Sequence, residues 1–152
     1  MKVQWTPITQ QDAEEIAGWK YPEPYNFYDM TADEEDLELF INPEKRSPHT
    51  YTAYKDGELI GFLTLDLKNL PIIDIGLGMH PDEAGKGRGE RFVKSCLSFA
   101  TKTYQAGAFT LSVATFNKRA IAVYERVGFK AKETFMQATN GGHYEFLSME
   151  KQ

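Results

Sequence analysis

The sequence predicts a single-domain protein of the α/β (α+β) class. Segments with helical periodicity alternate with segments of period two, and no linker-like composition divides the 152 residues. Apolar residues make up 41% of the chain and aromatic residues 13%, which is typical of a protein that buries a core. The expected order of elements over residues 1–152 is βααβββαβαββ.

The N-terminal third predicts one strand and two helices. Residues Lys2–Pro7 alternate apolar and polar side chains, as a short strand does. Thr9 with Asp12 three residues later has the spacing of a capping box, and Thr31 with Glu34 repeats it before an acidic helix. Between these helices, two prolines predict a loop, which is unusual for its four aromatic residues.

The remainder of the chain predicts six strands and two helices. Turns at residues 55–57 and 140–142 place glycine after Asp or Asn, which is typical of hairpins, and Gly128 suits the left-handed end of a helix. The strands are expected over Thr50–Tyr54, Leu59–Leu67, Ile72–Met79, Phe109–Thr115, Phe129–Met136 and His143–Met149, and the helices over Arg88–Tyr104 and Lys118–Val127.

Charge and cysteine content argue against several classes of protein. A formal net charge of −5 argues against nucleic acid as the partner, because phosphate backbones favour basic surfaces. The single cysteine, Cys96, lies on an apolar helical stripe, which indicates a core residue. With no signal peptide and no apolar run that spans a bilayer, we expect a soluble, cytoplasmic protein that does not bind membranes. Whether it forms a homodimer is left open.

The stretch AGKGRGERFV, residues 84–93, places Gly85, Gly87 and Gly89 between a predicted strand and a predicted helix. Glycines let a ligand reach main-chain N–H groups, and a helix N-terminus adds free donors and a partial positive charge. Lys86 and Arg88 add two positive side chains. The pattern favours a phosphate-binding loop, and the alternative is a flexible connector that only caps the helix.

Three known phosphate-binding loops are candidates. The P-loop requires Ser or Thr after Gly-Lys, and neither follows here. The dinucleotide fingerprint requires G-x-G-x-x-G within a βαβ unit, whereas this chain has G-x-G-x-G and a different strand order. The third candidate is the loop that binds the pyrophosphate of an acyl-CoA.

Two segments resemble motifs of the GNAT superfamily of acyl-CoA-dependent N-acyltransferases. Residues 72–93, IIDIGLGMHPDEAGKGRGERFV, are similar to its central motif, and residues 116–129, FNKRAIAVYERVGF, are similar to the motif that follows it. The resemblance implies a single-domain GNAT fold over residues 1–152, with a mixed, mostly antiparallel central sheet flanked by helices. Ala84 departs from the Gln or Arg that is usual in the family, which implies weaker anchoring of the loop.

The resemblance also implies the reaction. An acetyl group would pass from acetyl-CoA to a primary amine of a small molecule or peptide by direct attack in a ternary complex, without a metal. His49, His80 and His143 show no paired spacing for metal ligation. The CoA contacts of the family map onto the strand, the loop and the second motif, at Leu77, Gly78, Met79, Ala84, Gly85, Lys86, Gly87, Arg88, Gly89, Glu90, Asn117 and Tyr124.

Two residues are the candidates for proton transfer. The resemblance places Tyr124 beside the CoA sulfur as general acid, and a phenol stays protonated at neutral pH while it donates a strong hydrogen bond. Asp74 occupies the strand position where many family members carry a catalytic Glu, so it is the candidate base, acting through water. From the residues alone, core packing also explains Tyr124, and a solvated strand face also explains Asp74.

Other candidate residues have structural alternatives too. Asn117 maps to the pantetheine-binding residue of the family, but Asn is also a favourable N-cap for a helix that begins at Lys118. Gly76 and Gly78 predict a bulge that exposes the main chain of the strand to the pantetheine, and simple strand irregularity is the alternative. A main-chain N–H at this strand end would polarise the thioester oxygen.

The acceptor amine is expected to lie against aromatic side chains of the N-terminal half and the last hairpin. Glu23 and Asp29 are candidates to attract its ammonium group. The alternative is that these rings only cover the core, because aromatic residues dominate core burial. The residues concerned are Tyr21, Tyr25, Phe27, Tyr28 and Tyr144, with Phe146 next to the last of them.

Two other functions remain open from the sequence. A domain of the same fold without catalysis would bind or sense an acyl-CoA, and the presence of Tyr124 argues against it. A nucleotide-binding protein would use the glycine loop for ATP or NAD, with no competition from CoA. The sequence does not identify the acceptor amine.

Overall fold

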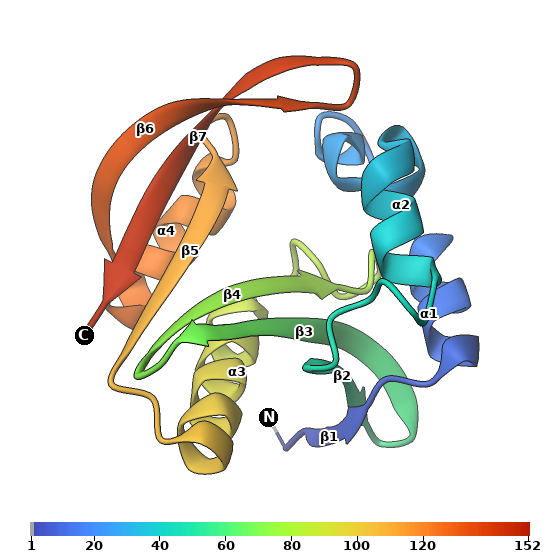
Figure 1. The fold of residues 1–152 in the computed structure, drawn as a ribbon, viewed down its shortest axis with the longest axis horizontal. Coiled ribbons are helices and arrows are strands. Elements are labelled where there is room, and N and C mark those ends of the chain that lie inside the picture. The colour runs from blue at the N-terminus through green and yellow to red at the C-terminus, as the bar shows by residue number, and fades with distance from the viewer. Residues whose placement is uncertain (1) are drawn as a thin grey trace.

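The structure, a computed structural model, describes residues 2–152 and contains one seven-stranded sheet with helices on both faces (Figure 1). The strand order is β1-β2-β3-β4-β5-β7-β6, and neighbouring strands are antiparallel except for β4 and β5, which confirms the predicted fold class and element order. The strands are β1 (Gln4–Pro7), β2 (Thr50–Lys55), β3 (Glu58–Asn69), β4 (Ile72–Met79), β5 (Ala108–Ala114), β6 (Lys130–Thr139) and β7 (Gly142–Lys151). The helices are α1 (Gln10–Ala17), α2 (Glu34–Ile41), α3 (Gly89–Tyr104) and α4 (Lys118–Val127), with short 3-10 helices η1 (Tyr25–Tyr28) and η2 (Met30–Ala32).

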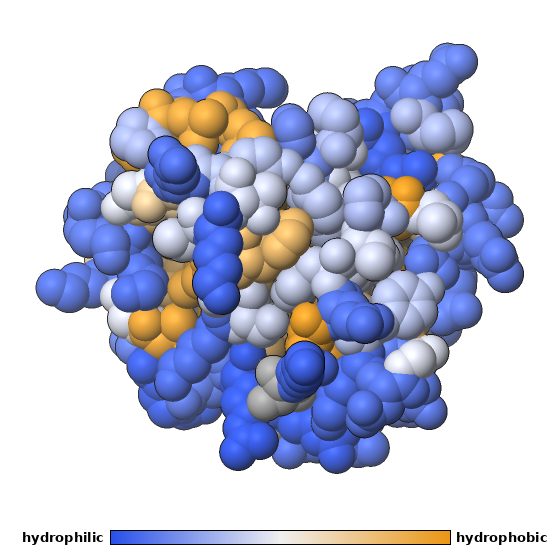
Figure 2. Space-filling view, turned by 90° about the horizontal axis from the view of Figure 1, so that it is seen from below, coloured by the Kyte–Doolittle hydropathy of each residue, from blue (hydrophilic) through white to orange (hydrophobic). Residues whose placement is uncertain are grey.

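The surface is largely polar. Figure 2 shows one face on which hydrophilic side chains surround small apolar patches. Met136 of β6, at 64% exposed, and Leu70 between β3 and β4, at 50% exposed, are the most exposed large apolar residues of the described chain. In residues 2–152, no helix has both the length and the apolar character that crossing a membrane requires.

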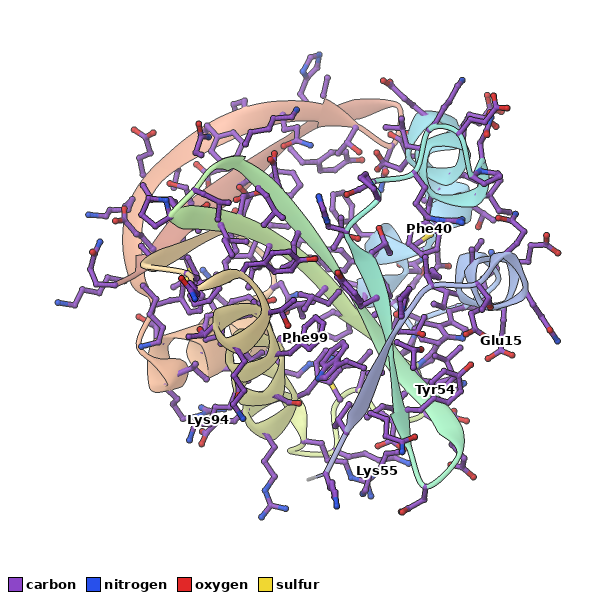
Figure 3. The ribbon with its side chains drawn as sticks, turned by 60° about the horizontal axis from the view of Figure 1, so that its bottom comes forward. Glu15, Phe40, Tyr54, Lys55, Lys94 and Phe99 are labelled. Carbon is purple, nitrogen blue, oxygen red and sulfur yellow. The ribbon has the colours of Figure 1, made fainter. Side chains whose placement is uncertain are left out.

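A small hydrophobic cluster attaches α1 and α2 to the sheet. Phe62 of β3 packs against Trp19 and Phe40, with ring centroids 6.4 and 5.3 Å away. Ile16 of α1 is buried in the same cluster. Phe40 comes from α2 (Figure 3). Side chains alternate between the faces of a strand, so Phe62 points away from its neighbour Leu63, which belongs to the main core.

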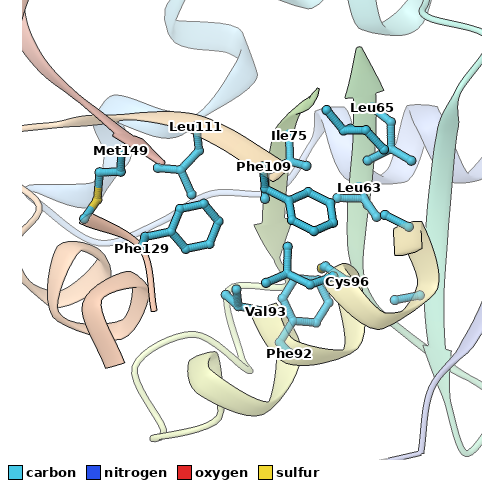
Figure 4. Packing of buried hydrophobic residues seen from close by; sticks show 14 of the residues in the cluster. Leu63, Leu65, Ile75, Phe92, Val93, Cys96, Phe109, Leu111, Phe129 and Met149 are labelled. Carbon is cyan, nitrogen blue, oxygen red and sulfur yellow. The ribbon is translucent and has the colours of Figure 1, made fainter. Parts of the chain in front are cut away.

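The main hydrophobic core lies between the sheet and α3. Leu63 and Leu65 of β3 and Ile75 of β4 are buried with Phe92 and Cys96 of α3 (Figure 4). The apolar residues of α3 recur every three or four positions, because one side of the helix meets the sheet and the other meets solvent. Cys96 is 1% exposed, which confirms the predicted core position.

The helix starts follow the predicted capping at α1 but not at α2. Thr9 is the N-cap of α1 and accepts a hydrogen bond from the Asp12 N–H at 3.1 Å, as predicted. The prediction that Thr31 begins the second helix is wrong, because Thr31 lies in η2. Asp33 is the N-cap of α2 and accepts a hydrogen bond from the Asp36 N–H at 3.0 Å. An extended backbone at Asp33 lets its carboxylate turn back onto the first helical turn.

The bulge predicted at Gly76 and Gly78 is absent from the pairing of β4 with β3. Gly76 pairs with Thr64 and Gly78 with Phe62 in continuous register, and the register shifts only beyond Asp66. Gly78 has a packing role instead, since a Cβ there would lie 2.4 Å from the Phe62 ring. At Gly76 a Cβ would meet nothing within 4 Å. The two glycines therefore leave one face of β4 bare of side chains without bending the strand.

Strands β4 and β5 meet at one end and then diverge. Their parallel pairing extends only from Ile72–Ala108 to Asp74–Thr110. Beyond that point β4 stays paired with β3 as far as Met79, while β5 stays paired with β7 (Figure 1). The sheet thus opens into a V, and its inner edges present main-chain N–H and C=O groups that no strand of residues 2–152 pairs across the gap.

The tip of the β6–β7 hairpin is tied to the N-terminal helices. The N–H of Asn140 and the hydroxyl of Thr139 donate to Oδ2 of Asp33 at 2.9 and 3.0 Å. The Asn140 side-chain amide donates to the Phe27 carbonyl at 2.8 Å. Asp33 therefore both caps α2 and holds the hairpin across the open side of the V (Figure 1).

Candidate active site

A cavity of about 430 Å³ occupies the mouth of the V between β4 and β5. The glycine loop, the diverging strands, α4 and the aromatic segment around η1 all contribute to its walls. Of the predicted CoA residues, only Lys86 and Arg88 lie outside the lining. Of the predicted acceptor residues, Phe27 and Tyr144 lie outside it. The structure therefore brings most of the predicted site together in one space.

The glycine loop has the geometry of an anion-binding turn. Gly85 and Gly87 have φ angles of 78° and 74°, in the left-handed region that favours glycine. Alternation of such residues with ordinary ones turns successive N–H groups inward to form an anion-binding concavity. Helix α3 begins at Gly89, and its N-cap residue Arg88 provides no side-chain cap. The first N–H groups of α3 are thus left for a ligand.

A positive charge from α4 lies against the loop. Arg88 forms an ion pair with Glu83, so much of its charge is compensated. Arg119 of α4 lies over the loop, with Nη1 2.7 Å from the position a Cβ would take on Gly85. Its guanidinium also stacks 4.0 Å from the centroid of the Tyr25 ring, an arrangement that orients the group. The sequence predictions missed Arg119, and its place two residues after Asn117 was the only signal for it.

Glu90 links the loop to α4. Its carboxylate accepts hydrogen bonds from Lys94 Nζ at 3.1 Å and from Arg126 Nε at 3.2 Å. The hydrogen bond from Lys94 is the largest cause that lowers the pKa of Glu90, and Arg126 adds to it. The predicted CoA residue Glu90 thus fixes the distance between the start of α3 and the end of α4.

The aromatic segment is tied to the end of β4. The Tyr21 hydroxyl donates to the Met79 carbonyl at 2.7 Å, and the Tyr21 N–H donates to Oδ1 of Asp29 at 2.9 Å. Burial raises the pKa of Tyr21 and the Asp29 carboxylate raises it further, so this phenol stays a donor. Leu77, which also lines the cavity, leaves its main chain beside the gap.

Tyr124 lines the cavity with an unpaired hydroxyl. No group of residues 2–152 forms a hydrogen bond with this hydroxyl. Burial raises the pKa of Tyr124 well above its usual range, and Tyr28 and Cys96 add to the effect. The ring packs edge-on against Phe129 at 5.9 Å. Tyr124 therefore combines the predicted packing role with a protonated, unused donor at the cavity wall.

Asn117 is the N-cap of α4, and its side chain also reaches the cavity. Its Oδ1 accepts a hydrogen bond from the Ala120 N–H at 3.1 Å, which confirms the capping alternative. Its Nδ2 donates to the Tyr28 hydroxyl at 3.2 Å. Burial is the main cause that raises the pKa of Tyr28, and the bond from Asn117 opposes it. Asn117 thus connects α4 to the aromatic segment across the V.

Asp74 lies beside the cavity, outside its lining. Its Oδ1 accepts a hydrogen bond from the Thr110 hydroxyl at 2.7 Å, at the point where β4 and β5 part. Desolvation raises the pKa of Asp74, the Thr110 bond lowers it, and the Asp66 carboxylate raises it. Asp74 shares a face of β4 with Gly76, two residues along. Gly76, which lines the cavity, therefore places no side chain beside this carboxylate.

The remaining predicted acceptor residues form an aromatic group that contacts the cavity wall through Tyr28, whose ring centroid lies 5.3 Å from that of Phe27. The Phe27 ring lies 4.9 Å from that of Tyr144 and 6.2 Å from that of Phe146. These rings pack against the hairpin outside the cavity lining, and the carboxylates of Glu23 and Asp29 lie outside the lining as well.

Several apolar residues of the lining were absent from the predicted site, and four of them form one wall. Ile16, Trp19, Met30 and Phe62 form the wall of the cavity nearest α1 and η2. The indole N–H of Trp19 is buried and has no hydrogen-bond partner within residues 2–152. The sequence placed Ile16 and Trp19 on an apolar stripe, which is compatible with any core, so nothing marked them as part of a site.

Sequence comparison gives the family of the chain. The Acetyltransferase (GNAT) family matches residues 11–129, and the chain therefore belongs to this family, as its two motifs predicted. Among curated proteins, N-alpha-acetyltransferase RimI of Mycobacterium tuberculosis is 33% identical over 96 residues. That alignment spans 59% of this chain and 58% of the relative, so the chain matches less than two thirds of the relative's length.

Solved structures share the fold over nearly the whole chain. Spermidine N-acetyltransferase from Vibrio cholerae, in complex with CoA and spermine, superposes with a TM-score of 0.75 at 18% identity, covering 97% of this chain and 94% of that one. AAC(6')-Ib in complex with ribostamycin and coenzyme A superposes with a TM-score of 0.75 at 17% identity, covering 100% and 94%. At these identities the likeness shows the fold alone.

Proposed function

We propose that the protein transfers an acetyl group from acetyl-CoA to a primary amine of a small molecule or peptide, by direct attack in a ternary complex. The cavity that joins the glycine loop, Tyr124 and the aromatic segment carries this proposal. Membership of the GNAT family supports it, as do the names of the RimI relative and of the Vibrio cholerae spermidine N-acetyltransferase.

Main-chain N–H donors would provide most of the binding of the CoA pyrophosphate. N–H groups between Gly85 and Gly89 would bind the pyrophosphate, because a helix N-terminus and inward-turned amides favour an anion. Arg119 supplies the cationic side chain at the same place. The pantetheine would run along the unpaired edge of β4 at Leu77, Gly78 and Met79.

The chemistry needs an aligned thioester, a neutral amine and a proton for the departing thiolate. The amine nitrogen attacks the thioester carbon, a C–N bond forms and the C–S bond breaks. A main-chain N–H of β4 would stabilise the oxyanion that develops on the thioester oxygen. Tyr124 donates its proton to the sulfur, and the proton lost by the amine passes through water to Asp74. Exchange with water then returns a proton to the Tyr124 phenolate and removes one from Asp74, which restores both groups. The products are the N-acetylated amine and CoA with a free thiol.

The direct test is release of free thiol from acetyl-CoA, screened over amines, amino acids and peptides. We expect amine-dependent thiol release. The product should be about 42 Da heavier than the amine, because an acetyl group replaces one hydrogen. Binding of CoA without thiol release across a wide panel would favour an acyl-CoA sensor. Tight ATP or NAD binding that CoA does not displace would favour a nucleotide-binding protein.

A further inference from the structure

We propose that the acceptor chamber selects an amine that carries an apolar or aromatic substituent and no second positive charge. The acceptor chamber is the part of the cavity lined by Ile16, Trp19, Tyr21, Met30 and Phe62. This inference rests on the proposed acetyl transfer and narrows its substrate class.

The walls of the acceptor chamber are uncharged. Ile16, Trp19 and Phe62 belong to the buried cluster under α1 and α2, and Met30 packs against the same cluster. Two of these side chains have a polar tip: the Tyr21 hydroxyl already donates to the Met79 carbonyl, and the Trp19 indole N–H is an uncharged donor without a partner in residues 2–152. A substituent placed here would contact carbon atoms on most sides, so burial of apolar surface would supply its binding free energy.

The charged groups of the cavity lie at its other end. Glu90, Arg119 and Arg126 are the charged residues of the lining, and they belong to the first turn of α3 and to α4. The Glu90 carboxylate is already paired with Lys94 and Arg126. No carboxylate of residues 2–152 lines the acceptor chamber, so a second ammonium group would be desolvated there without a counter-charge.

Asp29, which precedes Met30 in the sequence, does not contribute to the walls of the chamber. Asp29 accepts a hydrogen bond from the Tyr21 N–H, and it lies outside the lining. The floor of the chamber is β4, where Gly76 leaves open space and Gly78 has the Phe62 ring against it. The chamber is thus shaped by rings over a bare strand, which suits a flat or branched apolar group entering beside the reacting amine.

The test compares matched amines in the free-thiol assay. Phenylalanine amide and phenethylamine each carry one amine and a ring, whereas spermidine is a polycation with a similar number of non-hydrogen atoms. We expect kcat/KM for each aromatic amine to exceed that for spermidine by about tenfold or more, which corresponds to about 1.4 kcal/mol. Equal or better use of spermidine would overturn the proposal. The two aromatic amines distinguish a peptide N-terminus from a simple arylalkylamine.

Two variants test the chamber itself. Met30→Glu adds a carboxylate to the acceptor chamber and should reduce the aromatic-to-spermidine ratio by about tenfold. Leu39→Glu adds the same charge to an exposed position of α2 outside the cavity and should leave the ratio unchanged. An unchanged ratio in Met30→Glu, or an equal shift in Leu39→Glu, would contradict the assignment of the chamber.

A binding measurement separates this inference from the proposed function. Calorimetric titration of each amine into the CoA-bound protein measures selectivity without any transfer. Tighter binding of phenethylamine than of spermidine would support the proposed selectivity of the chamber, whether or not thiol is released. Absence of thiol release would overturn only the proposed acetyl transfer. Thiol release with preferred binding of spermidine would keep acetyl transfer and overturn the chamber.

Discussion

Tyr124 lines the cavity with a hydroxyl that no group of residues 2–152 uses, and this defines the first prediction. Tyr124→Phe removes the proton available to the thiolate but keeps the ring contact with Phe129. We expect kcat to fall by about a hundredfold or more, because general acid catalysis typically contributes about 10² to 10⁴. Acetyl-CoA affinity should not change. Steady-state kinetics and equilibrium binding measure the two quantities separately.

A tyrosine outside the cavity provides the control for this variant. Tyr104 of α3 hydrogen-bonds the Tyr51 hydroxyl in the main core and lies outside the cavity lining. Tyr104→Phe should lower stability and leave kcat at the wild-type value. If Tyr124→Phe retained the wild-type kcat, Tyr124 would have only a packing role.

Asp74 gives a prediction about pH. In the folded protein desolvation raises its pKa, so the native state holds this proton to higher pH than the unfolded chain does. Ionisation of Asp74 therefore lowers stability as pH rises through the folded pKa, and Asp74→Asn should be the more stable protein above it. The side chain is partly exposed, so we expect a small difference that disappears at acidic pH. Thermal unfolding of both proteins at pH values from about 3 to 8 measures this difference in stability, because the range includes the usual Asp pKa of about 3.9 and extends above it.

The catalytic role of Asp74 has a separate readout in the pH profile of kcat/KM. If Asp74 accepts the proton, Asp74→Asn removes the rise in activity that follows its ionisation. Thr110→Val keeps the carboxylate but removes the hydrogen bond that lowers its pKa, so the rise should move to higher pH. Identical profiles for both variants and the wild type would assign the proton to water in the cavity instead.

The sequence predicted individual residues well where one local rule applied. Asn117 met its capping expectation, since its Oδ1 caps α4, and its contact with the pantetheine stays a prediction. Arg119 escaped prediction because its importance arises from two contacts with distant segments, Gly85 and the Tyr25 ring. A cation in the first turn of a helix has no sequence pattern that distinguishes such a role from a solvated side chain.

At the scale of elements, the glycine loop yields a prediction free of packing effects. Gly87 has a φ of 74°, and a Cβ there would meet nothing within 4 Å. Gly87→Ala therefore changes only the backbone preference, which costs roughly 1–2 kcal/mol in the left-handed region. We expect the loop to populate other conformations and the Kd for acetyl-CoA to rise by about tenfold. Isothermal titration calorimetry gives this value directly.

The β2–β3 hairpin offers a matched control for the loop. Gly57 has a φ of 79° and equally open surroundings, but it lies in the hairpin turn away from the cavity. Gly57→Ala should cost similar stability and leave acetyl-CoA affinity unchanged. If Gly87→Ala and the wild type bound acetyl-CoA with equal affinity, binding of acetyl-CoA would not depend on the left-handed conformation at Gly87.

Element types were predictable from periodicity, whereas some details inside them were not. The second helix begins after Asp33 instead of Thr31, because η2 inserts a 3-10 turn that the capping pattern does not reveal. Glycines in a strand are compatible with a bulge or with a close neighbour, and at Gly78 the neighbour is Phe62, which follows from register. Register depends on partner strands, so one segment alone does not specify it.

At the scale of the whole molecule, the site exists because the two halves of the sheet barely touch at the V. The parallel ladder between β4 and β5 ends at Asp74 and Thr110, and the hairpin tie from Asn140 to Asp33 closes the opposite side. Both features join residues that are far apart in sequence, so local periodicity contains no signal for them. The sequence analysis expected only an exposed main chain near Gly76 and Gly78, and nothing in the sequence indicated the hydrogen bonds between the hairpin and Asp33.

A ligand that fills the V should act as the missing strand between β4 and β5. Amides of residues 75–79 that face the gap have no partner on β5, so they should exchange hydrogen rapidly without ligand and slowly with it. With acetyl-CoA at about a hundred times its Kd, exchange that requires ligand release should slow by about a hundredfold, equivalent to about 2.7 kcal/mol. Hydrogen exchange read by mass spectrometry measures this change, with β1 at the sheet edge as the internal control. Protection that appeared equally in β1 would indicate general stabilisation, and no protection at residues 75–79 would place the pantetheine elsewhere.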